Sequence, residues 1–140
     1  MNKLFRFING FLNNDGHRIF GPEHRVMISD SARIQNALIN TMSGFVTIKE
    51  DVFFGHNVLL LTGEHDYTKV GRERQTTVLE CGNDIFIERG VWIASNAIVI
   101  GPCRIGHDSV IGAGSIITKD IPPLKVIAGN PAKVIRDVEK

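Results

Sequence analysis

The chain has 140 residues, the length of one domain, and its contents of 43% hydrophobic and 22% charged residues are ordinary for a globular protein. Its formal net charge of +1 does not favour nucleic acid or an anionic membrane as the main partner. No stretch approaches the roughly 20 apolar residues that a membrane-spanning helix needs. Two cysteines without a metal-type spacing, and no predicted export signal, lead us to expect reduced thiols and a cytoplasmic protein.

The first twelve residues mix charged side chains with phenylalanine, isoleucine and leucine. They lack the continuous apolar core and the small-residue cleavage site of a signal peptide. The pattern predicts a short amphipathic cap. We assign residues 1–27 to an N-terminal cap segment that precedes the repeat.

Large apolar residues recur every six positions from residue 28 onward. The position four residues after each of them is usually small or β-branched, as at Val91, Ala97 and Cys103. A period of six is neither the 3.6 of a helix nor the 2 of an alternating strand. It predicts a short strand and a corner in each repeat, three repeats per coil, and coils that stack by parallel pairing. We therefore predict an all-β fold, a parallel β-helix over residues 28–123. The three series are Ile28 and Ile34; Ile48, Phe54 and Leu60; and Ile87, Ile93, Val99, Ile105, Ile111 and Ile117.

The repeat is interrupted by a long polar segment between Leu60 and Ile87. Residues 64–84 are predicted to form an excursion loop that leaves a corner of the prism and returns to it. Loops of this length are often functional. A shorter irregularity lies at residues 40–44.

The repeat ends at Pro122 and Pro123, because proline cannot donate a hydrogen bond to a neighbouring strand. Residues 124–140 are then predicted to form a C-terminal extension. We expect a short terminal strand there, followed by a helical turn near Val134–Glu139.

Several segments resemble the hexapeptide-repeat acetyltransferases in fixed order. They are Val-Trp-Ile-Ala-Ser-Asn-Ala at 91–97, Ile-Gly-Ala-Gly-Ser at 111–115 with Thr-Lys-Asp-Ile-Pro-Pro at 118–123, and Ala-Gly-Asn-Pro-Ala-Lys-Val-Ile-Arg at 128–136. The likeness covers about residues 28–136 and is nearest to the galactoside, maltose and capsular-polysaccharide O-acetyltransferases. It implies a left-handed coil, whereas ordinary parallel crossovers are right-handed. It also implies acetyl-CoA as cosubstrate and a homotrimer with active sites between subunits.

His65 is the candidate catalytic residue. It ends a hexapeptide and begins the excursion loop. Acetyl transfer to a hydroxyl needs a base that takes up a proton near neutral pH, which suits imidazole. In the family that the chain resembles, the histidine at this place is that base. Glu64, Asp66 or a backbone carbonyl could orient its ring.

The resemblance implies a set of cofactor contacts along the later coils. Cationic side chains would meet the CoA phosphates, and Ala113 between two glycines would let the pantetheine arm approach the backbone. Neither cysteine is placed as a nucleophile, so we expect direct transfer without an acyl-enzyme. The implied cofactor-binding residues are Trp92, Ser95, Ala113, Thr118, Lys119, Lys133 and Arg136.

The acceptor is less constrained. Asn36, in the irregular early coil, is our predicted acceptor contact, with Asn40 and Ser43 as further candidates. The related enzymes carry a longer N-terminal helical region that contributes to their acceptor pocket. The acceptor's identity is therefore not implied here.

We favour an acetyl-CoA-dependent O-acetyltransferase that acts on a saccharide without a required metal. N-acylation of a nucleotide-linked amino sugar is the main alternative. A γ-type carbonic anhydrase shares the fold but needs a closely spaced histidine pair, and the five histidines are spaced too widely for it. A non-catalytic β-helix scaffold would need neither the CoA motifs nor the loop histidine.

Overall fold

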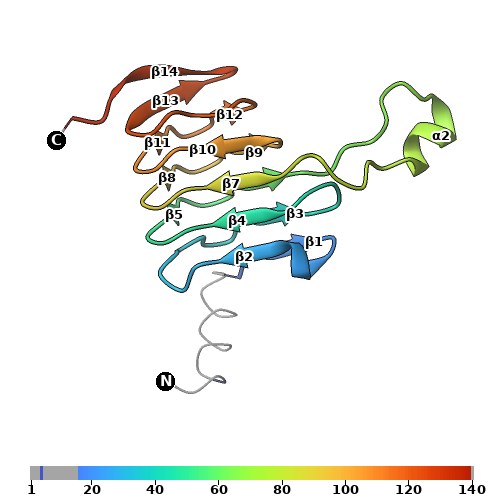
Figure 1. Ribbon diagram of the computed structural model, residues 1–140, viewed down its shortest axis with the longest axis horizontal. Helices are drawn as coiled ribbons and strands as arrows, with labels where there is room; N and C mark the ends of the chain where they lie inside the picture. The colour runs from blue at the N-terminus through green and yellow to red at the C-terminus, as the bar shows by residue number, and fades with distance from the viewer. Residues whose placement is uncertain (1–3, 5–15, 140) are drawn as a thin grey trace.

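A computed structural model describes Leu4 and residues 16–139 of the chain. Three parallel β-sheets wind into a triangular prism (Figure 1). One end is formed by β1 (Arg18–Phe20) and β2 (Val26–Ile28), and the other by β13 (Lys125–Gly129) and β14 (Ala132–Asp137). The predicted amphipathic cap lies outside the described residues, apart from Leu4. Within the part of the chain that the structure describes, no helix is long and apolar enough to cross a bilayer.

Each sheet forms one face of the prism, and the chain passes through the faces in a fixed cycle. Face A contains β1 (Arg18–Phe20), β3 (Leu38–Asn40), β6 (Leu59–Leu61), β9 (Ile98–Ile100) and β12 (Ile116–Ile117). Face B contains β2 (Val26–Ile28), β4 (Val46–Ile48), β7 (Ile85–Ile87) and β10 (Cys103–Ile105). Face C contains β5 (Phe53–Phe54), β8 (Trp92–Ile93), β11 (Val110–Ile111), β13 (Lys125–Gly129) and β14 (Ala132–Asp137). We name the corners edge AB, edge BC and edge CA after the faces that they join.

The pairing register follows the six-residue repeat. Ile98 on β9 pairs with Ile116 on β12, three hexapeptides later in the chain. All six members of the long series have 0% exposure, and they fill the inside of the prism from its three faces, two on each face. The prediction of a β-helix of hexapeptide repeats is therefore confirmed, and the three parallel sheets are consistent with a left-handed coil.

The corners are tight, and two kinds of residue make them possible. A residue with positive φ, such as Asn57 (59°) or Asn96 (62°), turns the chain, and asparagine tolerates this conformation better than most residues. A small or β-branched residue follows it inside the corner. On edge CA these inward residues are Ala37, Val58, Ala97 and Ser115, all with 0% exposure.

The coil begins earlier and ends later than the repeat predicts. β1 already pairs with β3, and β2 pairs with β4, so coiling begins before residue 28. A 3-10 turn at Glu23–Arg25 separates these two strands and hides their spacing in the sequence. At the other end, β13 pairs in parallel with β11 and buries Ile127 completely.

The predicted helical turn near Val134–Glu139 is wrong. Residues of this segment form β14, which pairs antiparallel with β13. Val134 and Ile135 are β-branched and favour an extended chain. The free edge of β13 offers hydrogen-bond partners to an extended segment, and a helix could not use them.

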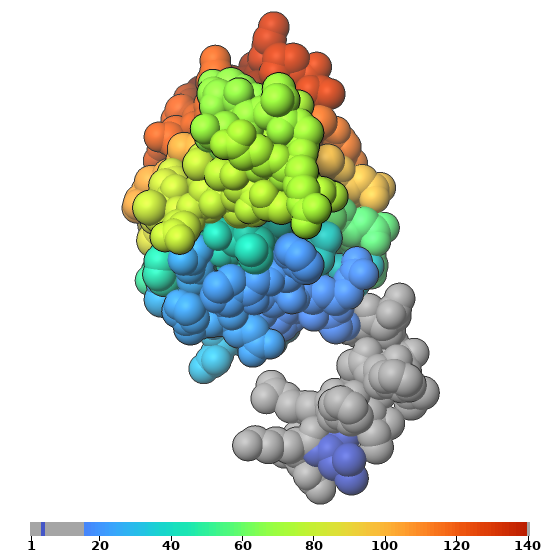
Figure 2. All heavy atoms as spheres, turned by 90° about the vertical axis from the view of Figure 1, so that its right-hand side faces the viewer, coloured from blue at the N-terminus to red at the C-terminus, as the bar shows by residue number. Residues whose placement is uncertain are grey.

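The excursion leaves the prism after β6 and returns at β7. It projects from edge AB and carries one short helix, α2 (Gly71–Thr76). Figure 2, which looks onto the side where it projects, shows the excursion standing in front of the middle coils. Among residues 16–139, the excursion is the element that projects from the prism.

The prism interior predicts a strong contrast between two isoleucines. Ile93→Ala, at a side chain with 0% exposure, is expected to lower the free energy of unfolding by about 2–5 kcal/mol, because it leaves a cavity that the coils cannot close. Ile135→Ala, at a side chain that is 61% exposed, should change it by less than about 0.5 kcal/mol. Urea denaturation measures both. Equal effects would contradict the assignment of the core.

Candidate active site

His65 lies at the root of the excursion on edge AB, with an exposed side chain. Its Nδ1 is 3.0 Å from the backbone carbonyl oxygen of Arg74 in α2. A carbonyl oxygen can only accept, so Nδ1 must carry the proton. In the neutral ring, Nε2 then keeps the lone pair. The geometry therefore selects the tautomer in which Nε2 can accept a proton.

The two carboxylates beside His65 have other partners. Glu64 Oε2 accepts a hydrogen bond from Asn83 Nδ2 at 2.9 Å. Asp66 Oδ1 accepts from the hydroxyl and the backbone N–H of Thr68, and these two bonds lower the pKa of Asp66. Of the three orienting groups considered from the sequence, the backbone carbonyl is the one that contacts the ring.

A hydrogen-bond network of buried polar side chains fixes the root of the excursion. Thr62 Oγ1 accepts from the backbone N–H of Ser43, and Ser43 Oγ accepts from the N–H of Glu64, each at 3.1 Å. On the returning arm, Asn83 Nδ2 also donates to the carbonyl of Thr62 at 3.0 Å. Ser43 and Thr62 are almost fully buried. The irregularity at residues 40–44 is thus the coil that anchors the excursion, and Ser43 serves that anchor.

Arg25 was not distinguished from a surface charge by its sequence context. Its Nη1 donates to the carbonyls of Thr41 and Met42 at 3.1 Å and of Glu80 at 3.0 Å. These bonds tie the returning arm to the early coil. Asn40 packs against the start of the outgoing arm at Gly63. A Cβ added at Gly63 would lie only 2.6 Å from Asn40 Oδ1.

Two predicted cofactor contacts share edge AB with His65. Thr118 and Lys119 follow β12 in the corner column where His65 follows β6. Both side chains are exposed. Edge AB therefore carries the imidazole, a hydroxyl and an ammonium group along one side of the prism.

Edge CA carries a different part of the predicted site. Ser95 Oγ accepts from the backbone N–H of His56 at 3.0 Å, and Ala113 is exposed next to Gly114, whose φ is +70°. Asn36 lies lower on this edge, where its amide donates to and accepts from Asn57 at 2.9 Å. These residues stand at the opposite end of face A from His65.

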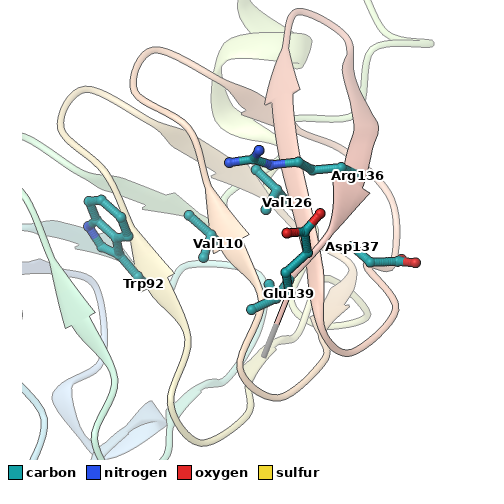
Figure 3. A pocket seen from close by; sticks show the side chains of 7 residues that line it. Trp92, Val110, Val126, Arg136, Asp137 and Glu139 are labelled. Carbon is teal, nitrogen blue, oxygen red and sulfur yellow. The ribbon is translucent and has the colours of Figure 1, made fainter.

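Trp92 lies on face C, where it is 42% exposed. It stacks on Phe53 of the preceding coil, with ring centroids 5.7 Å apart. On its other side a pocket of about 460 Å³ opens over β11 and β13, and Arg136 extends across Val126 towards it (Figure 3). The residues that line the pocket are Trp92, Val110, Val126, Arg136, Asp137, Val138 and Glu139.

The predicted site residues do not meet within one chain. His65, Thr118 and Lys119 lie on edge AB, and Ser95, Ala113 and Asn36 lie on edge CA. Trp92 and Arg136 lie on face C, and Lys133 is exposed near the start of β14.

The two cysteines lie in different environments. Burial, with a smaller contribution from Asp120, raises the pKa of the Cys103 thiol to about 12. Cys103 faces the core, and Cys81 is exposed in the returning arm of the excursion.

Known proteins share both the repeat and the fold. Residues 84–119 match the family model described as bacterial transferase hexapeptide (six repeats). Galactoside O-acetyltransferase of Escherichia coli (strain K12) is 43% identical over 97 residues, which cover 66% of this chain and 44% of that enzyme. The structure of a maltose O-acetyltransferase from Clostridium difficile 630 matches with a TM-score of 0.65 at 25% identity, covering 100% of this chain and 79% of that one. A galactoside acetyltransferase in complex with coenzyme A matches with a TM-score of 0.62 at 31% identity, covering 89% of this chain and 64% of that one.

The chain matches 44% of the length of the galactoside O-acetyltransferases from Escherichia coli and Lactococcus lactis, which is less than half of each. The chain is therefore a hexapeptide-repeat protein related to the galactoside and maltose O-acetyltransferases.

Proposed function

We propose that the chain is an acetyl-CoA-dependent O-acetyltransferase that acts on a saccharide. One observation carries the proposal: the carbonyl of Arg74 fixes the proton of His65 on Nδ1, which leaves Nε2 as a base at the surface. Relatives named as sugar O-acetyltransferases, one of them in complex with coenzyme A, support the donor and the class of acceptor.

We further propose that three copies assemble around an axis parallel to the prism. The outer surface of face A supports this, because its strands present aliphatic side chains to the outside. Such a surface needs cover in water. The outward residues pair from coil to coil in two rows, Leu38, Leu59, Ile98 and Ile116 in one and Leu61 and Ile100 in the other.

A ring of three with face A towards the axis has a direct consequence for the site. In such a ring, edge AB of one copy meets edge CA of the next. His65, Thr118 and Lys119 of one copy then face Ser95 and Ala113 of its neighbour. The assembly would unite the residues that one chain holds apart, and each active site would lie between two copies.

The proposed reaction is direct transfer in a ternary complex. His65 Nε2 takes the proton of the acceptor hydroxyl as its oxygen attacks the thioester carbonyl carbon. The new C–O bond forms, a backbone N–H stabilises the oxyanion, and the C–S bond then breaks. The imidazolium returns its proton to the departing thiolate. No covalent acyl-enzyme is needed.

The remaining contacts follow from chemistry and position. Lys119, Lys133 and Arg136 supply cations for the CoA phosphates. Asn36 Nδ2 donates one hydrogen bond to Asn57, and Asn36 Oδ1 accepts one from the backbone N–H of Asn57. The second N–H of the Asn36 amide is then available to bind the acceptor substrate.

The central prediction concerns His65. His65→Ala is expected to lower kcat by about 10²- to 10⁴-fold, the usual contribution of a general base. The KM for acetyl-CoA should change little, because the ring is not assigned a role in holding the cofactor. His17→Ala, which removes an exposed imidazole near the first coil, is the matched control. The assay is release of free CoA thiol with a panel of saccharides and amino sugars, and near-normal turnover by His65→Ala would overturn the assignment.

The assembly has its own test. Light scattering should give the mass of three chains. Ile98→Glu places a charge on outward face A and should yield monomers without activity. Thr47→Glu, an outward position on face B that pairs with Phe86, should leave the trimer intact. An active monomer would contradict the proposed assembly.

A further inference from the structure

The carbonyl that orients His65 belongs to a helix with little support of its own. Helix α2 has six residues, none of them buried, and Val70 at its N-terminus provides no side-chain cap. Isolated helices of this length are marginal in water. The place of the Arg74 carbonyl must therefore depend on polar contacts within the excursion.

Arg74 makes those contacts with its own side chain. Its Nε donates to the carbonyl of Lys69 at 2.6 Å, and its Nη2 donates to the carbonyl of Tyr67 at 3.2 Å. Both acceptors lie on the outgoing arm, a few residues after His65. The same residue thus holds the outgoing arm with its guanidinium and the imidazole with its carbonyl.

Other contacts in the excursion do different work. The backbone N–H of Asp66 donates to the carbonyl of Thr77, and that of Leu79 donates to the carbonyl of Glu64, so these bonds close the arms near the prism. The ion pair of Lys69 with Glu73 is exposed on both sides, and such pairs contribute little. Apart from this exposed ion pair and the contact with His65, the polar side-chain contacts between α2 and the outgoing arm among the described residues are the two hydrogen bonds of the Arg74 guanidinium.

We propose that the Arg74 side chain is a positioning residue for His65, a role that rests on the proposed function of His65 as the base. It holds the Arg74 carbonyl within hydrogen-bonding distance of Nδ1, and so keeps the proton there and the lone pair on Nε2. A planar guanidinium suits the task because it presents two donors in a fixed geometry, which a lysine ammonium does not.

The first test reads the tautomer and requires no acceptor. Nitrogen-15 NMR of histidine-labelled protein distinguishes Nδ1–H from Nε2–H, and the spectrum of His65→Ala identifies the His65 signals. The unaltered protein should show neutral His65 chiefly as Nδ1–H. In Arg74→Ala the Nε2–H form should rise substantially. Arg72→Ala is the matched control, since within the described residues the Arg72 side chain has no hydrogen-bond or ion-pair partner.

The second test reads turnover. Arg74→Ala should lower kcat by about tenfold, by analogy with the lower end of the effect of losing a group that orients a metal-bound histidine. The KM for acetyl-CoA and the Tm should stay near those of Arg72→Ala, and Arg74→Lys should restore only part of kcat.

The outcomes separate the two proposals. An Nδ1–H ring retained in Arg74→Ala, or an equal shift in Arg72→Ala, overturns the role of Arg74. A shifted tautomer with unchanged turnover supports the contact of Arg74 with the ring but overturns His65 as the base.

Discussion

The narrow interior of the prism is the constraint on which the rest of the structure depends. Each hexapeptide turns a large apolar side chain inward, and most corners accept a small or β-branched side chain. On edge CA that inward column is Ala37, Val58, Ala97 and Ser115, all with 0% exposure. An interior packed in this way has no room for a ligand. Chemistry must therefore be attached to the outside, at corners and at breaks in the repeat.

This constraint explains what could be predicted from the sequence. The inward positions tolerate few residue types, so their six-residue spacing is visible and predicts the strands, the core and the place of the excursion. His65 was found because it stands where the spacing breaks. The ends were predicted poorly, since the first and last coils are covered on one side only. There β1 and β2 lose the strict spacing, and β14 forms a hairpin where a helical turn was expected.

The contacts that orient the site follow no period. The carbonyl of Arg74 reaches His65 through the fold of the excursion, and no pattern of side chains marks a backbone acceptor. Asn83 and Arg25 anchor the excursion from positions that look like ordinary polar surface in the sequence. The polarity of Asn36 suggested an acceptor contact, which stays a prediction, and its hydrogen bonds to Asn57 along the edge could not be seen in the sequence.

In a single chain, the candidate site residues are divided between the two edges of face A. One edge presents the imidazole, the other presents the small corner at Ala113, and an aliphatic surface lies between them. We consider these three features as parts of one arrangement. In the trimer that we propose, the ring of copies would cover the aliphatic surface and would also bring the two edges together.

Mixing two inactive variants tests this arrangement most directly. His65→Ala disables edge AB, and Ala113→Trp fills the small corner of edge CA. Co-expressed in equal amounts, the variants should form mixed trimers in which about one quarter of the interfaces join two intact edges. The account predicts recovery of about a quarter of the unaltered activity in that mixture. A mixture of trimers that stays as inactive as its two components would contradict an active site shared between copies.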